Sequence, residues 1–205
     1  MSLGYDDYRY FMTRVTQSVD EDEDGGGSVF TVDGDGERDL ERDFKGLRYK
    51  QFEGVSAYGA VKSSYSEDYA EEDGAQVYVS SSATREQTEP VLTLYFFCSD
   101  SSVTDIASQY ESASELYHSF VEFLSGCYII YRDTIRQRRL LLYLSDEDEL
   151  EPETDSVKGR AYIECEFNFK NVFGRSFSLD DTTIAEYLSL SKYPTYTDST
   201  DSTGQ

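Results

Sequence analysis

The chain has 205 residues and carries 41 acidic against 18 basic residues, which gives a formal net charge of −23. That length suits a single domain. The charge disfavours sequence-specific nucleic-acid binding and anionic membranes, because both surfaces would repel the protein. The acidity is compatible with solvated loops, with a high-salt environment (only six of the bases are Lys), and with packing against basic partners.

The composition supports a packed aromatic core, with 18 Tyr, 12 Phe and no Trp, and some of the Tyr are expected at interfaces. The cysteines Cys98, Cys127 and Cys165 lie far apart, so we expect free buried thiols in a reducing compartment. No stretch approaches the roughly 18 apolar residues of a membrane span. Residues 1–10 carry no apolar secretory segment, so we expect use without Sec-type export.

Three regions differ in composition. Residues 1–45 are acidic and Gly-rich and are expected to be partly flexible, with Phe11 to Val19 and Ser28 to Val32 as the arms of a hairpin. Residues 46–190 are expected to form a single β-rich domain with one helix. Residues 191–205 are rich in Ser, Thr and Asp and are expected to form a disordered tail.

The helix and the strand before it are the first clear elements. Val91 to Cys98 is apolar on both faces, which predicts a central strand. Ser102 followed by Asp105 fits a capping box, and a long amphipathic helix over about 103–125 would end at Gly126. Its apolar residues recur four and three apart and are expected on the core face: Ile106, Tyr110, Ala113, Tyr117, Phe120 and Leu124.

Further strands are expected on both sides of this pair. Short strands and turns fill 47–79, two strands over 127–131 and 140–144 flank a turn, and an acidic loop follows over 146–155. Ala161 to Phe173 alternates apolar and polar residues and is the clearest strand. A short helix is expected to start at Asp180 or Asp181. The order predicts an α+β fold, a mostly antiparallel β-sheet or sandwich with one long helix packed on it.

One acidic run resembles part of a calcium loop. Asp20, Asp22 and Asp24 followed by Gly25 match the first half of the loop pattern, but its twelfth position is Thr31, where a bidentate Glu is needed. Loose cation condensation is therefore the favoured interpretation of this run, and no specific metal site or cofactor is predicted.

Two further patterns were weighed as catalytic groups. His118 is the only histidine, and with no GxSxG elbow in the chain it is expected on the helix surface. Glu164 and Glu166 could act as an acid and base pair, but they lie two apart on the outward face of a strand. The sequence therefore predicts a protein that is not an enzyme.

Four arginines stand out in this acidic chain: Arg132, Arg136, Arg138 and Arg139. Guanidinium groups at a hairpin turn suit the binding of carboxylates on a neighbouring subunit. The equally favoured alternative is charge balance with the acidic loop over 146–155. We therefore treat this cluster as a candidate oligomer or partner interface.

The order of elements resembles the distal-tail and tail-tube proteins of long-tailed phages. Those proteins follow a strand with a helix that ends in a Leu-x-Gly-like turn, a strand with a terminal Asp, a returning strand and an aromatic alternating strand. The segments that carry the resemblance here are Leu92–Phe96, Phe123–Gly126, Tyr128–Asp133, Leu140–Leu144 and Tyr162–Phe169. Residues 67–74 are also similar to a segment of proteins assigned to virions in prophages of gut bacteria. The resemblance covers roughly 62–174, and the acidic N-terminal region departs from the family pattern.

The resemblance implies a non-enzymatic virion protein, a subunit of a phage tail or tail-adaptor ring. It would be made in the host cytoplasm, assemble into a homo-oligomeric ring and dock to other tail or baseplate proteins. The runner-up hypothesis is an acidic protein-binding module, either a nucleic-acid mimic or a cation-dependent interaction domain. An enzyme of unrecognised type would need a pocket near His118 or the Glu164 and Glu166 face.

Overall fold

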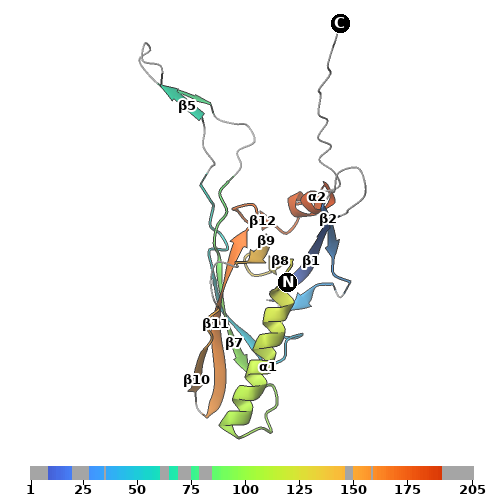
Figure 1. Ribbon diagram of the computed structural model, residues 1–205, viewed down its shortest axis with the longest axis vertical. Coiled ribbons are helices and arrows are strands. Elements are labelled where there is room, and N and C mark those ends of the chain that lie inside the picture. Colours follow the sequence, from blue (N-terminus) through green and yellow to red (C-terminus); the bar gives the residue numbers. More distant parts are fainter. Residues whose placement is uncertain are drawn as a thin grey trace, which may run out of the picture.

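The computed structural model describes residues 9–19, 28–34, 36–60, 85–145, 150–157 and 159–190, and the backbone of 65–68 and 75–78. It confirms the predicted α+β class, because the described chain is mostly antiparallel β-sheet with two helices (Figure 1). The acidic run of Asp20, Asp22 and Asp24, for which loose cation condensation was favoured, and the tail over 191–205 lie outside the described residues. The elements are β1 (Tyr10–Val19), β2 (Ser28–Val32), β3 (Arg38–Asp39), β4 (Leu47–Glu53), β5 (Tyr65–Asp68), β6 (Ala75–Tyr78), β7 (Val91–Phe97), α1 (Ile106–Leu124), β8 (Tyr128–Asp133), β9 (Arg138–Leu144), β10 (Glu153–Val157), β11 (Arg160–Asn171), β12 (Phe177–Ser178) and α2 (Thr183–Leu190).

The main sheet has the strand order β2-β1-β8-β9-β11-β7-β4, and β10, β12 and β3 pair with β11, β9 and β1 off this path. The long strand β11 joins its two halves. Residues 162–168 of β11 pair with β7, and residues 169–171 pair with β9. Strands β5 and β6 form a separate two-stranded sheet, which Figure 1 places beyond one end of the main sheet, away from β10.

The core lies between the sheet and α1 (Figure 1). The alternation predicted for β11 is confirmed, because Ile163, Cys165, Phe167 and Phe169 are all buried. The Phe167 ring packs edge-on against the Phe120 ring of α1, with centroids 5.5 Å apart. Burial of such a side chain contributes about 1.5–3 kcal/mol, so this face of β11 holds the helix far better than helix propensity does.

The start of α1 differs from the prediction. Asp105 itself is the N-cap, and its carboxylate accepts a hydrogen bond of 2.9 Å from the Ser108 amide. Ser102, expected as the cap, instead donates its amide to Asp100 in a turn before the helix. A side chain that accepts from the residue three positions on satisfies a free amide of the first turn, which is why the helix begins where it does.

The predicted core face of α1 is correct from Ala113 onward, where Phe123 is buried in addition, whereas Tyr110 is only half-buried. Ile106 is 39% exposed, whereas Gln109 is buried in its place. The Gln109 amide donates to the Val103 carbonyl over 2.9 Å and accepts from the Ala161 amide over 2.8 Å. This side chain therefore ties the loop before the helix to β11, a polar role that apolar spacing does not reveal. Gly126, with φ of 66°, follows the helix as predicted.

The N-terminal residues take part in the sheet. The expected hairpin is confirmed as β1 and β2, paired from Val15 with Val32 to Val19 with Ser28. β1 also pairs with β8, and Met12 and Leu40 are fully buried in the main core. The division drawn at residue 45 thus follows composition, while the described part of 9–45 packs with the rest of the domain.

Two smaller elements complete the chain. The predicted short helix is α2, whose Ile184 packs with Leu141 and Phe177 in a second apolar cluster. The prediction of an acidic loop over 146–155 is wrong at the C-terminal end of this range, because Glu153 to Asp155 belong to β10. Main-chain pairing with β11 overrides the low strand propensity of Asp and Glu.

The connections to β5 and β6 leave the body through a close backbone contact. The Gly59 amide donates to the Gly174 carbonyl over 2.7 Å, and the Glu86 amide donates to the Ala60 carbonyl over 2.7 Å. A Cβ added to either glycine would lie 1.9 Å from the Glu86 carbonyl oxygen. Neither glycine therefore has room for a side chain of its own in this contact, which we call the backbone junction, and the Arg85 guanidinium donates to the Gly59 carbonyl over 2.9 Å.

Candidate interface surfaces

The four arginines of the predicted cluster lie along one hairpin. Arg132 is on β8, Arg136 is in the turn, and Arg138 and Arg139 begin β9. Arg132 faces Arg139 across the strand pair, and Asp133 faces Arg138. Residues directly opposite share a face of the sheet. Arg132 and Arg139 are thus on one face and Arg138 on the other, so the cluster is split in two.

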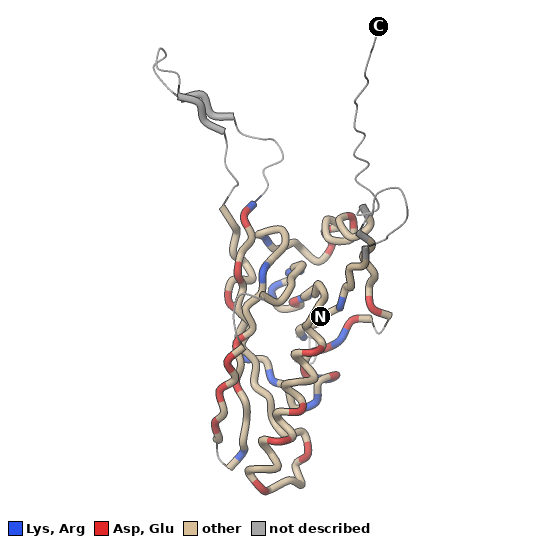
Figure 2. Tube along the Cα trace, in the orientation of Figure 1, with Lys and Arg blue, Asp and Glu red and all other residues tan. Residues whose placement is uncertain are grey.

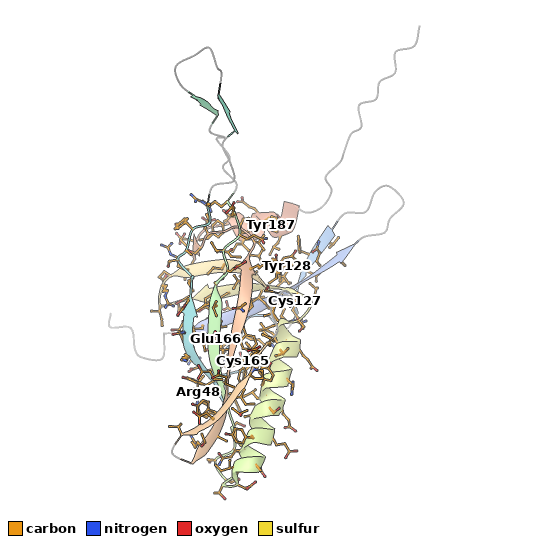
Figure 3. All side chains as sticks on the ribbon, turned by 60° about the vertical axis from the view of Figure 1, so that its left-hand side comes forward. Arg48, Cys127, Tyr128, Cys165, Glu166 and Tyr187 are labelled. Atoms are coloured by element: carbon orange, nitrogen blue, oxygen red, sulfur yellow. The ribbon has the colours of Figure 1, made fainter. Side chains whose placement is uncertain are left out.

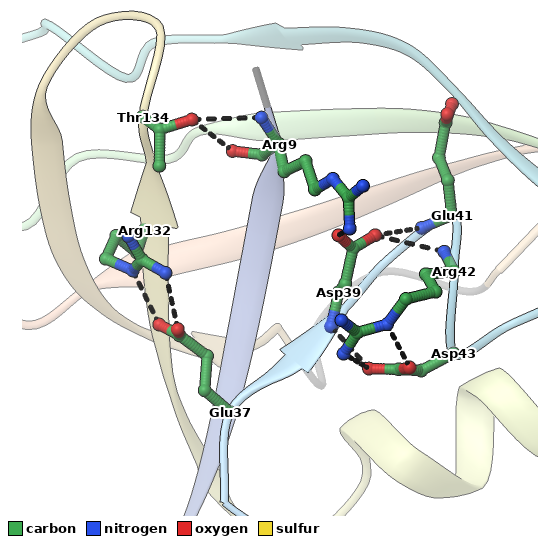
Figure 4. Close-up of polar contacts among 8 residues, drawn as sticks. All are labelled: Arg9, Glu37, Asp39, Glu41, Arg42, Asp43, Arg132 and Thr134. Atoms are coloured by element: carbon green, nitrogen blue, oxygen red, sulfur yellow. Dashed lines mark hydrogen bonds and ion pairs between the residues drawn. The ribbon is translucent and has the colours of Figure 1, made fainter. Parts of the chain in front are cut away.

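Arg132 serves the fold. Its guanidinium binds the Glu37 carboxylate through two nitrogens, with Nε 2.6 Å from Oε1 (Figure 4). It also lies over the Phe11 ring, 4.1 Å from the centroid. A two-point contact of this kind is among the stronger ion pairs in proteins. Arg132 therefore ties the chain before β3 to β8, and its ion pair among the described residues is with Glu37.

Arg136 also has an internal partner. Its Nη1 lies 2.6 Å from the Asp133 carboxylate, which is fully buried and accepts from the Ile135 and Arg136 amides as well. This hydrogen bond, with a second to the Tyr49 hydroxyl, raises the pKa of Arg136. The arrangement closes the turn between β8 and β9.

The start of β1 is fixed beside the same turn. The Arg9 amide donates to the Thr134 hydroxyl over 2.9 Å, and the Arg9 guanidinium lies 3.1 Å from the buried Asp39 carboxylate (Figure 4). Asp39 also accepts from the Glu41 and Arg42 amides. Two buried carboxylates thus organise this edge, and both are satisfied within the chain.

Arg138 and Arg139 are the members of the cluster that remain for a partner. Both are half-buried, and neither makes an ion pair with a carboxylate among the residues that the structure describes. Arg139 does lie near Asp181, whose pKa is lowered mainly by hydrogen bonds from Thr183 and slightly by this charge. An interface on the hairpin would therefore use these two side chains.

The edge strand β10 is a second candidate surface. Its five residues are all exposed, and it pairs only with β11. The Ala161 amide donates to Gln109 and not to β10, so Ser156 and Ala161 are a non-hydrogen-bonded pair. Because such pairs alternate in an antiparallel ladder, Thr154 and Ser156 turn their main-chain groups outward. The Ser156 amide donates to the neighbouring Asp155 carboxylate over 2.6 Å, which leaves Thr154 as the position where this edge can accept a strand from another chain.

The Glu164 and Glu166 face lines an open hollow of 320 Å³ with Glu151 and Glu153. Glu164 makes an ion pair with Lys50 of β4, and this hydrogen bond raises the pKa of Lys50. Figure 3 shows Glu166 on β11 beside Cys165. The predicted surface position is thus seen for both residues, but one carboxylate of the acid and base pair is already bound.

A basic hollow was missed by the sequence reasoning. It encloses 710 Å³ and is lined by Lys45, Arg48 and Arg160 together with Glu41 and Asp100. The first two cations fall within the short basic stretch 45–50, which was a usable signal. Arg160 is more than a hundred positions away, and the pairing of β11 and β4 on either side of β7 brings it near.

The remaining candidates stay on the surface or in the core. His118 is exposed on α1, as predicted, and Cys127 and Cys165 are buried free thiols while Cys98 is half-buried. No three His, Cys, Asp or Glu side chains gather to hold a metal within the described ranges. Over those same residues, no helix has the length and apolarity to cross a membrane.

Comparison with models of known protein families found no match, and comparison with curated protein sequences found none either.

Proposed function

We propose that the protein is a non-enzymatic structural subunit of a phage tail or tail-adaptor ring. It is made in the host cytoplasm and resides in the virion, where it self-assembles and docks to other tail or baseplate proteins. The observation that carries the proposal is β10, an edge strand with every side chain exposed and with the main-chain groups of Thr154 turned outward. The resemblance over roughly 62–174 supports the same reading.

Strand pairing between subunits would use this edge. The main sheet path ends at β2 and β4, which offer edges for the pairing. Glu153 and Asp155 on β10 disfavour indiscriminate association, because charges on an edge repel most strands. Association then depends on a partner of complementary charge, which suits a contact with one defined geometry.

The first experiment measures the mass of the full chain by light scattering at moderate and high salt, with negative-stain images of the same samples. Rings or tubes are expected. A monomer at both salt concentrations and at high protein concentration would contradict self-assembly.

A substitution then tests the edge. Thr154→Pro removes an outward main-chain donor and leaves the pairing with β11 intact, so it is expected to block assembly while the chain stays folded. Thr154→Ala keeps the donor and is the matched control. Equal assembly of both variants would argue against β10 as the contact.

The arginine hairpin is tested separately. Arg138→Glu with Arg139→Glu is expected to weaken assembly at moderate salt, because both side chains lack a carboxylate partner in the described chain. Arg136→Glu is unsuitable for this purpose, since it would place a second carboxylate beside buried Asp133 and destabilise the fold.

The hollow lined by Glu151, Glu153, Glu164 and Glu166 favours a second candidate, an acidic module that binds a basic protein. If the protein is such a module, it should be a monomer or dimer, and replacing Glu153 and Glu166 by Gln should abolish its binding to a basic partner. Thr154→Pro should leave its mass in solution unchanged.

A further inference from the structure

We propose that the basic hollow receives the acidic segment around β5 and β6 of a second copy of this chain, in a head-to-tail contact. The proposal deepens the proposed function and rests on it, since it names one contact through which the subunits would assemble.

The cations of the hollow stand apart from the other bases. Lys45, Arg48 and Arg160 are exposed, and none forms an ion pair with a carboxylate of the described residues. Six other cations do form such pairs. In a chain with 41 acidic residues, three exposed cations around one hollow are a local reversal of the overall charge.

The two carboxylates of the hollow do not neutralise these cations. Glu41 accepts from the Tyr49 amide over 3.2 Å, and Asp100 accepts from the Ser102 amide over 2.8 Å. Arg48 uses one Nη1 donor on the Leu47 carbonyl, which leaves other donors of its guanidinium for a ligand. The hollow therefore offers cationic donors to carboxylates, which an arginine can bind through two nitrogens.

The chain carries one segment that fits this chemistry. Between Lys62 and Arg85 there is no basic residue, and five acidic residues fall within seven positions: Glu67, Asp68, Glu71, Glu72 and Asp73. Glu67 and Asp68 belong to β5, which pairs only with β6 and not with the main sheet. We call this sequence segment the acidic arm; it is rich in the required groups, and its described strands β5 and β6 form a sheet of their own.

The acidic arm and the basic hollow lie at opposite ends of the β4 and β7 pair. The hollow includes Gly46, before β4, and Phe97, at the end of β7. The arm leaves the chain after β4 and returns before β7, and the pairing of Glu53 with Val91 marks that other end. Figure 1 shows the same separation, with β5 and β10 at the two ends of the long axis, and Figure 2 shows the charges along the tube between them.

Because of this separation the contact joins different copies. A head-to-tail contact uses two different surfaces, and it closes into a ring when its rotation allows and forms a filament otherwise. The backbone junction at Gly59, Glu86 and Gly174 fixes the root of the arm to the body. The root therefore sets where the arm of one copy can meet the hollow of the next.

Two full-length variants test the contact. The hollow variant carries Lys45→Gln, Arg48→Gln and Arg160→Gln. The arm variant has the acids of the arm replaced by their amides. The control is Ala107→Glu with His118→Glu and Ser119→Glu on the exposed face of α1, which changes the net charge as much as the hollow variant does. Sedimentation velocity is measured for each at about 0.1 M salt, where screening acts over about 10 Å.

The hollow variant and the arm variant are each expected to need at least a tenfold higher protein concentration than the wild type to assemble. The control is expected to assemble at the same concentration as the wild type. The equimolar mixture of the two variants is expected to form a 1:1 complex at concentrations at which neither variant associates alone, because the pair retains one arm and one hollow. The inference is overturned if the hollow variant assembles as the wild type does, or if the two variants stay separate in the mixture. Either result leaves the proposed function standing. A monomeric wild type overturns both.

Discussion

Asp133 offers a quantitative test of how the hairpin between β8 and β9 is held. Its side chain is fully buried, and it accepts from the Ile135 amide, the Arg136 amide and the Arg136 guanidinium over 2.9, 2.9 and 2.6 Å. Asp133→Ala removes all of these hydrogen bonds, whereas Asp133→Asn keeps an acceptor for the two amides and loses the ion pair.

The magnitudes follow from exposure. The Arg136 side chain is 41% exposed, so solvent screens the ion pair and its loss costs less than about 1 kcal/mol. Each amide left without a partner costs about 1 kcal/mol, the lower end of the range, because both residues lie in an exposed turn. We therefore expect a loss of about 2–3 kcal/mol for Asp133→Ala and about 1 kcal/mol for Asp133→Asn.

The assay is urea unfolding followed by circular dichroism, at a protein concentration low enough to keep the chain monomeric, since assembly would add to the apparent stability. In a thermal melt of the same samples, Asp133→Ala is expected to lower Tm by about 4–12 °C, because a chain of this size loses about 2–4 °C per kcal/mol. Equal losses for the two variants would show that the ion pair, and not the turn, provides the stability. A loss near zero for Asp133→Ala would refute the reasoning altogether.

Three other outcomes are expected. Gly174→Ala should cost about 2–4 kcal/mol in urea unfolding, because its Cβ would meet a backbone oxygen at 1.9 Å, while Gly126→Ala, with open space around it, should cost only about 1–2 kcal/mol for its positive φ. Asp105→Ala should lower Tm by a few degrees and Asp105→Asn much less. The hydrogen bond from the Ser108 amide lowers the pKa of Asp105 in the folded protein. The stabilisation by Asp105 is therefore fully present above the pKa that Asp105 has in the unfolded chain, and it is lost as the pH falls through the lower pKa of the folded state. Thermal melts of the wild type and of Asp105→Ala should therefore converge in acid. Burial raises the pKa of Cys165 to about 11, so its thiol should resist iodoacetamide at pH 8 in the folded protein and react after unfolding, whereas half-buried Cys98 should react first, as read by mass spectrometry.

Local sequence patterns predicted most of the helices and strands, but they predicted little of the two candidate interface surfaces. The alternation of β11 and the period of α1 report burial directly, since each face repeats within a few residues. The start of α1 was misplaced because Ser102 and Asp105 are both good caps, and only the surrounding turn selects between them. The pairing of β11 with β7 and then β9 depends on contacts far apart in sequence, which single-residue patterns do not encode.

The candidate site shows the same limit. The arginine cluster was visible as a run of bases, but its division into internal and available members depends on Glu37, 95 positions from Arg132. The basic hollow combines Lys45 with Arg160 through strand order alone. The sequence thus shows which charged side chains are present, whereas the strand order determines which of them lie close enough to pair.

The backbone junction has a mechanical consequence. A load on β5 and β6 enters the body beside Gly59 and Glu86. The Glu86 amide is bonded to the Ala60 carbonyl, and the Gly59 amide passes the load to the Gly174 carbonyl, just after β11. β11 is shared by both halves of the sheet, so a pull on this projection is spread over β7 and β9 together. The Arg85 guanidinium adds a hydrogen bond of 2.9 Å to the Gly59 carbonyl, so the junction combines main-chain contacts with one side-chain contact.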